Sequence, residues 1–303
     1  MRFGPARACA AVHARAVRPA GRDAEPENAL PGRPAGCWGV PMPHGDHAAL
    51  LELLDRELRR GARPDGPGAR IERTGRVVRQ VATGQGCWNG VVWSALDEAT
   101  VDAVIAEQVG YYSALGLDFE WKSYGYDGPA DLGRRLCAAG FTPGPEETLM
   151  AARIADLDLD ADLPHGVRVE PVTDSAGVDL VADVHAKAFG ADSSWLRDRL
   201  LARLSAAPDT VVAVVAMAGD EPVSAARMEL PPGTRFAGLW GGGTVADWRG
   251  RGIYRALVAH RAHAAAARGY RCLQVDASSR SRPILERLGF ASLTTTTPYV
   301  YAP

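Results

Sequence analysis

The spacing of hydrophobic positions between residues 45 and 155 predicts a mixture of helices and strands. Leucines recur every three or four positions after Asp46, a residue type that caps helix N-termini. Shorter apolar runs, bounded by Gly, Pro and Asp, are typical of strands. One predicted helix begins at Asp46, and two more span residues 98–115 and 130–139. The predicted strands span residues 77–81, 87–96, 119–123 and 147–154.

Residues 165–303 show the same two periodicities in a more regular alternation. A turn sequence, Gly219-Asp220-Glu221-Pro222, joins two apolar runs into a predicted hairpin. The predicted strands span residues 167–172, 210–217, 223–230, 236–244 and 271–277, with a last Thr-rich strand ending at Tyr301. One predicted helix begins at Asp174 or Ser175, and three more span residues 195–204, 252–268 and 283–288. Strands that alternate with helices in this way predict an α/β fold.

A weak internal repeat relates the two halves of the chain. Residues 116–141 and 269–290 share one order of features: a glycine that stops a helix, a strand, a short helix, and a Gly-Phe pair entering another strand. The two copies lie roughly half the chain apart, which favours two related domains in tandem. We place the first domain at residues 45–155 and the second at residues 165–303.

Residues 1–44 differ from the rest of the chain. Arginines are scattered among Ala, Gly and Pro, no acidic residue precedes Asp23, and there is no apolar periodicity. This composition predicts a disordered extension. A start codon assigned too early, with Met42 as the true start, is the related interpretation. An arginine-rich transit peptide is less consistent with the Pro and Gly content.

Composition and charge exclude several classes of protein. Hydrophobic residues make up 47% and charged residues 23%, so a globular chain is expected. The formal net charge of -2 argues against binding along DNA or RNA. The five cysteines are far apart and odd in number, so we expect no disulfide framework and no metal site. No apolar run reaches the length of a membrane span, and the reduced cysteines favour a cytoplasmic protein.

One short segment carries a specific chemical signal. Arg249-Gly250-Arg251-Gly252 follows an apolar strand and opens the long predicted helix. Glycines at such a turn let consecutive backbone N–H groups point into one concavity, where the helix N-terminus adds partial positive charge. This arrangement binds phosphates, and the two arginine side chains would add ionic contacts. A tight turn that needs glycine for steric reasons alone is the alternative.

The segment and its surroundings resemble the GNAT superfamily of N-acetyltransferases. The family signature, Arg/Gln-x-x-Gly-x-Gly/Ala, corresponds to residues 249–254, and a family Leu-Gly-Phe corresponds to residues 288–290. The resemblance covers about residues 166–301, the whole second half. Together with the repeat, it implies two GNAT-like mixed α/β domains in tandem. Each would have a central, mostly antiparallel sheet with flanking helices.

The resemblance also implies an acetyl-CoA site in the second half. The strand at residues 240–244 would splay from residues 271–277 and admit the pantetheine arm. The backbone of Gly242 and Thr244 would pair with that arm and polarise the thioester carbonyl. The pyrophosphate would be held by the backbone N–H groups of Arg249, Gly250, Arg251, Gly252, Ile253 and Tyr254.

The corresponding stretch of the first half, residues 94–100, lacks the features of a phosphate site. It contains neither glycine nor arginine, and Asp97 and Glu98 would repel a pyrophosphate. We therefore expect residues 45–155 to form a degenerate GNAT-like domain without a cofactor cradle. The aromatic residues between positions 119 and 126 either form a binding wall or pack at the domain interface.

Two positions depart from the family pattern. The last small position of the signature is Tyr254, whose side chain must turn away from the phosphates or stack on the cofactor. Many family members carry a tyrosine that protonates the leaving thiolate, four residues before the glycine of Gly-Phe. That position is Leu285 here, so proton transfer would involve other side chains.

The candidates for proton transfer lie on strands near the expected opening. The candidate bases, acting through water, are Asp276 and Glu229, and the candidate acids are Tyr299 and Tyr301. Each has a structural alternative. Asp276 would cap a turn, Glu229 would be a surface residue, and the tyrosines would pack in the core.

The sequence therefore predicts an N-acetyltransferase that moves an acetyl group from acetyl-CoA to a primary amine of a small molecule. No nucleophile motif is visible, so direct attack in a ternary complex is expected. The alternative is a non-catalytic acyl-CoA-binding or regulatory module, which Leu285 favours. We expect no nucleic-acid or membrane partner, and either a monomer or a homodimer.

Overall fold

The computed structural model describes residues 44–66, 68–83 and 87–303. The predicted N-terminal extension, except its last residue, lies outside these residues. The helices are α1 (His44–Leu54), α2 (Val101–Ala114), α3 (Leu132–Ala138), α4 (Ser175–Phe189), α5 (Ser194–Ala206), α6 (Ile253–Ala267) and α7 (Arg282–Arg287). A π-helical turn, Asp55–Arg60, continues α1, and short 3-10 turns occupy Ile154–Asp156, Pro208–Thr210 and Ala246–Trp248.

The described residues form a twelve-stranded sheet that crosses both halves of the chain. Its strands are β1 (Ala69–Thr74), β2 (Val77–Ala82), β3 (Gly90–Ser94), β4 (Phe119–Tyr124), β5 (Thr142–Pro143), β6 (Glu147–Arg153), β7 (Val167–Pro171), β8 (Val211–Ala218), β9 (Glu221–Glu229), β10 (Phe236–Thr244), β11 (Cys272–Ala277) and β12 (Ala291–Tyr301). Their spatial order is β1-β2-β3-β4-β12-β6-β11-β10-β9-β8-β7, with β5 beside β12. Neighbours are antiparallel except for two parallel pairs, β3 with β4 and β10 with β11.

The internal repeat corresponds to two equivalent units of structure. In each unit a helix connects two parallel strands: α2 connects β3 to β4, and α6 connects β10 to β11. A short helix then ends at a glycine with a similar left-handed backbone, Gly140 with φ +98° and Gly289 with φ +100°. Only glycine adopts such angles without strain, so the two Gly-Phe pairs mark the same helix end.

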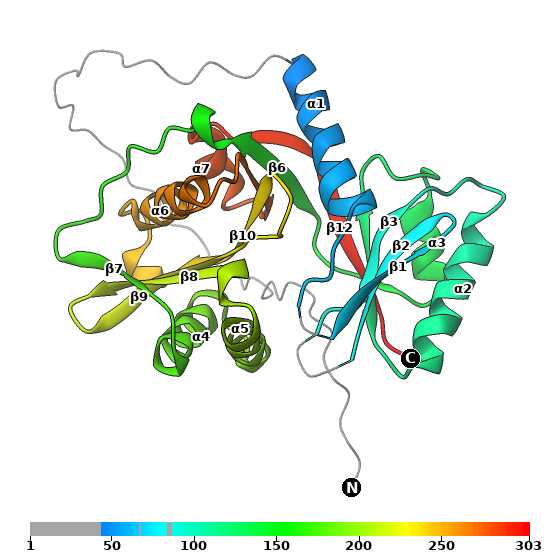
Figure 1. Cartoon of the computed structure of the whole chain (residues 1–303), viewed down its shortest axis with the longest axis horizontal. Helices are drawn as coiled ribbons and strands as arrows, with labels where there is room; N and C mark the ends of the chain where they lie inside the picture. Colours follow the sequence, from blue (N-terminus) through cyan, green and yellow to red (C-terminus); the bar gives the residue numbers. More distant parts are fainter. Residues whose placement is uncertain (1–43, 67, 84–86) are drawn as a thin grey trace, which may run out of the picture.

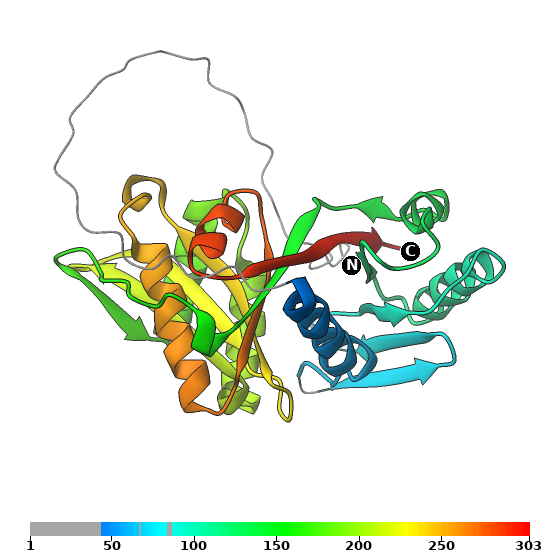
Figure 2. The same ribbon diagram turned by 90° about the horizontal axis from the view of Figure 1, so that it is seen from above.

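The two halves exchange their last strands. β6, from the first half, pairs with β11 of the second half along Thr148–Arg153. β12, the last strand of the chain, pairs first with β6 and then with β4 of the first half. Figures 1 and 2 both show β12 running from the second half into the first. The sheet is therefore continuous across the predicted domain boundary.

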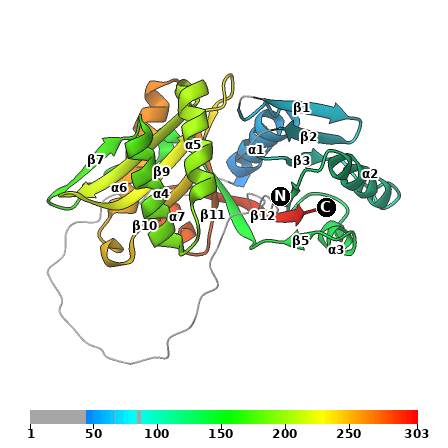
Figure 3. The ribbon, with the colours of Figure 1, turned by 90° about the horizontal axis from the view of Figure 1, so that it is seen from below.

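Helices cover both faces of the sheet and leave a gap in the cover of one face. In the second half, α6 and α7 lie on one face and α4 and α5 on the other (Figure 1). Viewed from below, α4 and α5 lie in front of the second-half strands and α1 lies beside them (Figure 3). Leu50 and Leu54 of α1 pack on Leu149 of β6 and Cys272 of β11, which belong to this same face. A cavity lies at this gap, lined on this face by residues of α1, α4 and α5 and on the other by residues of α6 and α7.

The sequence missed the strand β1 in the first half. β1 has the sequence ARIERT, which is mostly charged and carries no alternation of apolar positions. It is an edge strand, paired with β2 alone, and edge strands tolerate charged residues on both faces. Hydrophobic periodicity therefore gave no signal for it.

Candidate active site

A cavity of about 1510 Å³ lies where β10 and β11 separate. These strands pair in parallel only as far as Gly238, which lies opposite Gln274. Beyond that point β10 stays paired with β9, with a bulge between Trp240 and Gly243. The splay that the resemblance implied for residues 240–244 is therefore present, and it opens from one face of the sheet to the other.

The glycine turn before α6 faces open space. Gly250 and Gly252 have φ angles of +73° and +84°. A Cβ at Gly250 would meet no described atom within 4 Å, and one at Gly252 would meet only the Asp162 carbonyl oxygen, at 3.9 Å. Gly252 is the N-cap of α6, and no side chain caps the helix there. The turn therefore leaves room for a phosphate at a helix N-terminus, where N–H groups and the helix dipole favour an anion.

The two arginines of the turn have different contacts. Arg249 donates hydrogen bonds from Nε to the Thr244 carbonyl (3.0 Å) and from Nη2 to the Ala188 carbonyl (3.0 Å). Its guanidinium therefore ties the turn to β10 and α4, which the sequence did not anticipate. The Arg251 guanidinium lies over the Trp248 ring, 4.5 Å from its centroid. Because Arg249 binds the Thr244 carbonyl, that oxygen already has a partner within the fold.

Tyr254, in the first turn of α6, points along β10 rather than toward the glycine turn. Its Cε2 would lie 2.9 Å from a Cβ on Gly242, so the glycine allows the ring to approach the strand. Burial raises the pKa of Tyr254, while Arg261 and a hydrogen bond with Ser281 act in the opposite direction. Its hydroxyl therefore stays protonated at neutral pH, on the α6–α7 side of the cavity.

Arg261, two turns further along α6, is a buried cation that lines the cavity. It is 1% exposed, and its guanidinium donates to the Leu257 carbonyl (3.0 Å) and the Arg227 carbonyl (2.9 Å). Among the described residues no carboxylate pairs with it. Burial, together with the positive charge of Arg227, lowers its pKa to about 10. A positive charge without an anionic partner therefore lies close to Gly242.

Asp276, a predicted base, lies on the face of β11 that is turned toward α1. Its side chain is only 2% exposed, forms an ion pair with Lys122 of β4, and accepts a hydrogen bond from Thr296 Oγ1 at 2.9 Å. Despite the opposing effect of burial, the Asp276 carboxylate raises the pKa of Lys122. Asp276 thus lines the cavity as predicted, but with a partner from the other half of the chain.

Two further carboxylates that line the cavity with Asp276 were not predicted from the sequence. Glu120 of β4 and Glu147 of β6 line the cavity, and Glu120 accepts a hydrogen bond from Trp88 Nε1 at 3.3 Å. Burial raises the pKa of both groups, and the Asp276 charge adds to the effect, bringing Glu147 to about 7. The alternation at 119–122, aromatic at 119 and 121 and charged at 120 and 122, was the available signal for Glu120.

Glu229, the other predicted base, lies at the end of β9 among arginines. Its Oε1 is 3.5 Å from Arg199 Nη2 and 4.0 Å from Arg227 Nε. Burial opposes the shift, but the arginines lower the pKa of Glu229. It lines the cavity, yet a carboxylate held in its ionised form is a weak proton acceptor at neutral pH.

The predicted acids lie on the opposite face of β12 from the cavity. Thr296 and Pro298 line the cavity, and the pleat turns Tyr299 and Tyr301 away from it. The Tyr301 ring packs on Phe119 and Phe141, with centroids 5.9 and 5.3 Å apart. The Tyr299 hydroxyl lies against Gly133 of α3. The packing alternative therefore describes both tyrosines in this structure.

Leu285 of α7 is fully buried in the core below the α6–α7 layer. Tyr254 packs against the same cluster and lines the cavity on the same side. The first turn of α6 therefore supplies a tyrosine hydroxyl on that side, next to the serines that precede α7. In the sequence, Tyr254 stands out only as a departure from the signature. The direction of its side chain depends on how closely its ring approaches Gly242, which the sequence does not show.

The start of α2, the equivalent of α6 in the first half, is closed by its own side chains. The Thr100 N–H donates to Asp97 Oδ1 at 2.9 Å, and the Asp97 N–H donates to Thr100 Oγ1 at 3.2 Å. A carboxylate thus lies at the position equivalent to the glycine turn before α6. The Asp97 and Thr100 side chains therefore cap the start of α2, and the absence of a cofactor cradle in the first half stays a prediction.

Residues 179–290 match the model of the acetyltransferase (GNAT) family. They form a GNAT acetyltransferase domain. The matched segment contains the glycine turn, α6 and the separating strands β10 and β11. The resemblance inferred from residues 249–254 and 288–290 is confirmed. No curated protein shows significant similarity to this sequence.

Solved structures extend the likeness in fold to most of the chain. A GCN5-related N-acetyltransferase from Kribbella flavida is 18% identical, with a TM-score of 0.59 over 86% of this chain and 95% of that chain. A functionally unknown protein from Staphylococcus epidermidis is 14% identical, with a TM-score of 0.61 over 80% and 96%. A tandem GNAT protein from the clavulanic acid biosynthesis pathway is 12% identical, with a TM-score of 0.57 over 84% and 94%. The predicted mixed α/β fold, with its large, mostly antiparallel sheet, is confirmed.

Two other observations concern the described residues as a set. They contain no group of three or more His, Cys, Asp and Glu side chains arranged to hold a metal ion. None of their helices is long and apolar enough to cross a membrane.

Proposed function

We propose that the protein transfers an acetyl group from acetyl-CoA to the amine of a small molecule. The observation that carries this proposal is the open glycine turn at the N-terminus of α6, next to the separation of β10 and β11. The turn fits a pyrophosphate, and the separation leaves β10 backbone groups without partners on β11. Both features belong to the segment that matches the acetyltransferase family.

The residues around Gly242 provide the electrostatics for acyl transfer. When the amine nitrogen attacks the thioester carbon, negative charge develops on the carbonyl oxygen and then on the departing sulfur. The Arg261 guanidinium, buried beside Gly242, would stabilise that charge because it has no competing carboxylate. The carbon–sulfur bond breaks, and the Tyr254 hydroxyl, which lines this side of the cavity, would protonate the thiolate.

The wall around Asp276 provides the group that takes the amine proton. Asp276 is engaged in an ion pair with Lys122, and arginines lower the pKa of Glu229. Glu147, whose pKa burial raises to about 7, is better matched to accepting a proton near pH 7. We therefore assign the base to Glu147, through direct contact or one water molecule.

A non-catalytic acyl-CoA-binding module is the alternative, and acetylation measured as thiol release separates the two. Wild-type protein should release CoA thiol from acetyl-CoA when an amine is added, and Gly252→Asp should release none, because it places a carboxylate in the phosphate space. The matched control is Gly219→Asp, at an exposed turn with φ +60° and no described atom within 4 Å of a Cβ. Acetyl-CoA binding without thiol release for any amine would favour the module.

A further inference from the structure

Arg261 is a buried positive charge that the fold does not pair with an anion. Its side chain comes from the third turn of α6 and is almost fully buried. Nε and Nη1 donate to the Leu257 and Arg227 carbonyls, and Nη2 has no hydrogen-bond partner within the described part of the chain. The charged and titratable groups that act on Arg261 are Tyr254 and Arg227, and neither is a carboxylate.

The burial of this charge beside a cavity indicates a ligand. Taking a guanidinium out of water is unfavourable unless an anion compensates for the lost hydration. Burial lowers the pKa of Arg261 to about 10, with Arg227 adding to the effect and Tyr254 opposing it, so the group is still a cation at neutral pH. The two carbonyls satisfy donor atoms but carry no net charge. Because Arg261 lines the cavity, an anion bound there would supply the missing partner.

The position of Arg261 along α6 separates it from the phosphate space. Its guanidinium binds the carbonyl of Leu257, which lies five residues, or about 7.5 Å along the helix axis, beyond Gly252. A phosphate on the glycine turn would therefore not contact it. Nη2 would instead lie 3.8 Å from a Cβ on Gly242, the residue next to which we place the thioester. The anion near Arg261 therefore belongs to the acyl end of the site.

The face of the sheet favours the acyl donor over the acceptor as the source of this anion. The helix that carries Arg261 packs on Leu239 of β10 and Leu273 of β11. Alternate side chains of a strand point to opposite faces, and Asp276 lies on the other face, paired with Lys122. An amine that approaches the thioester from the α1 side would meet that ion pair first. Arg261 lies on the side of the donor.

The charge that develops during acetyl transfer pairs with Arg261 only briefly. It exists while the thioester carbonyl is under attack and while the thiolate departs, so the guanidinium stays unpaired between turnovers. A carboxylate carried by the acyl group would pair with Nη2 whenever the donor is bound, through charge-assisted hydrogen bonds. The closeness of Nη2 to Gly242 limits such an acyl group to a few carbon atoms.

We propose that the donor site accepts short acyl groups that end in a carboxylate, and that Arg261 binds this carboxylate. The proposal rests on the proposed acyl transfer and extends its donor from acetyl-CoA to thioesters such as malonyl-CoA and succinyl-CoA. The chemical step is unchanged. The amine nitrogen attacks the thioester carbon, the carbon–sulfur bond breaks, the amine loses a proton and the thiolate gains one. The product is an amide whose acyl part carries the carboxylate.

Donors that differ only at the end of the acyl chain test the proposal with the unaltered full-length protein. Calorimetry compares malonyl-CoA with propionyl-CoA and succinyl-CoA with butyryl-CoA, so that a carboxylate replaces a terminal methyl group in each pair. In at least one pair the carboxylated thioester should bind at least tenfold more tightly. Equal or weaker binding in both pairs would overturn the proposal and leave acetyl transfer intact. Failure of acetyl-CoA itself to bind would instead count against the proposed function.

Substitution of Arg261 tests whether this residue is responsible. Arg261→Met removes the charge, so the tenfold advantage of the carboxylated donor should fall below threefold, and Arg261→Lys should recover part of it. The control is Arg268→Met on the same helix. Arg268 also donates to the carbonyl four residues earlier, Ala264 at 3.0 Å, but it is exposed and outside the described cavity lining. An unchanged advantage in Arg261→Met would contradict the assignment; if that variant does not fold, the comparison in the wild type decides.

A carboxylate on the acceptor is the rival partner for Arg261. Acetyl transfer to 5-aminopentanoate and to pentylamine, a simple primary amine of the same length, distinguishes the two. The proposal predicts that Arg261→Met changes the kcat/KM for both acceptors by the same factor, within twofold. A KM that rises at least tenfold for 5-aminopentanoate alone would show that Arg261 binds the acceptor, and would overturn the proposal.

Discussion

Burial determines the chemistry of individual residues around the cavity. The pKa values of two glutamates on one face of the sheet are shifted in opposite directions. Arginines hold Glu229 ionised, whereas burial beside Asp276 brings the pKa of Glu147 to about 7. The sequence could identify carboxylates near the strand ends, but which of them faces a cation depends on neighbours far away in the chain. Glu147 was missed for that reason.

The pKa of Glu147 leads to a prediction for the pH dependence of acetyl transfer. Because burial raises this pKa to about 7, Glu147 is protonated below pH 7 and cannot take a proton from the bound ammonium. The kcat/KM for pentylamine should therefore fall about tenfold per pH unit below pH 7 and be level from pH 7 to about pH 10, where the free amine forms. Steady-state rates across pH 5.5–10 measure this profile.

The Glu147→Gln variant provides the comparison. Without the carboxylate only the deprotonated amine reacts, so kcat/KM should keep rising with pH to about 10 and show no break near 7. The control is Glu146→Gln, the same change at the exposed residue next to Glu147, and it should retain the wild-type pH profile. A break near pH 7 that survives in Glu147→Gln would show that another group is the base.

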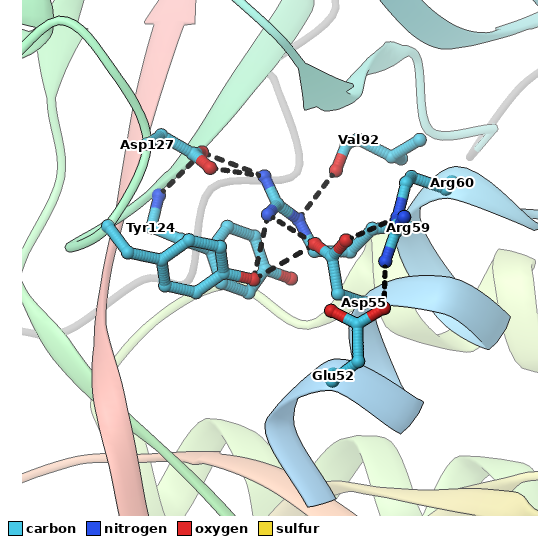
Figure 4. A network of polar contacts seen from close by, with 8 residues as sticks. Glu52, Asp55, Arg59, Arg60, Val92, Tyr124 and Asp127 are labelled. Carbon is cyan, nitrogen blue, oxygen red and sulfur yellow. Dashed lines mark hydrogen bonds and ion pairs between the residues drawn. The ribbon is translucent and has the colours of Figure 1, made fainter. Parts of the chain in front are cut away.

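At the scale of elements, a buried ion-pair network attaches the α1 segment to the sheet. Figure 4 shows Arg59, from the turn after α1, among Asp55, Asp127 and Tyr124. Arg59 donates to both Asp127 oxygens (2.9 and 2.7 Å), to Asp55 Oδ1 (2.8 Å) and to the Val92 carbonyl (3.1 Å). Its guanidinium also lies 3.7 Å from the Tyr124 ring centroid. Arg59 and Tyr124 line the cavity, so this network shapes one of its sides.

Removing Arg59 should destabilise the protein strongly. Arg59→Met leaves Asp55 and Asp127 without their buried cation, which typically costs about 3–5 kcal/mol in the free energy of unfolding. Arg60→Met is the control, because Arg60 is 41% exposed and its buried partner Asp55 keeps its ion pair with Arg59; a loss below about 1 kcal/mol is expected. Urea denaturation of both variants measures the difference, and equal losses would mean that burial of Arg59 has little energetic effect.

Most of the elements could be predicted from the sequence, because their signals are local. Apolar periodicity indicated α2, α4 and α6, and the glycine turn indicated the start of α6. The charged edge strand β1 carries no such signal, and the exchange of β6 and β12 depends on pairing between distant residues. The ion pair between Lys122 and Asp276 was missed for the same reason, since these residues become neighbours only through that exchange.

At the scale of the whole molecule, the strand exchange makes each half depend on the other. β6 covers the edge of β11, and β12 covers the edge of β4. An uncovered strand edge exposes unpaired N–H and C=O groups and promotes aggregation. The second half presents the glycine turn to the cavity, and the first half contributes Glu120 and Glu147 to its lining.

Cutting the chain between the halves tests this dependence. Residues 157–303 expressed alone lack β6 and should be insoluble or fail to bind acetyl-CoA, because β11 is left as an open edge. Co-expression of residues 1–156 with residues 157–303 should restore a soluble complex that binds acetyl-CoA. If residues 157–303 alone were soluble, with the full chain's melting temperature and acetyl-CoA affinity, the exchange would not be needed for stability.

The central claim is that one half of this tandem fold binds acetyl-CoA at the glycine turn before α6 while the other does not. Isothermal titration calorimetry of the full-length protein with acetyl-CoA tests it most directly. The account predicts one acetyl-CoA per chain for the wild type and for Gly219→Asp, and no binding for Gly252→Asp. Two equivalent sites per chain, or wild-type affinity in Gly252→Asp, would contradict it.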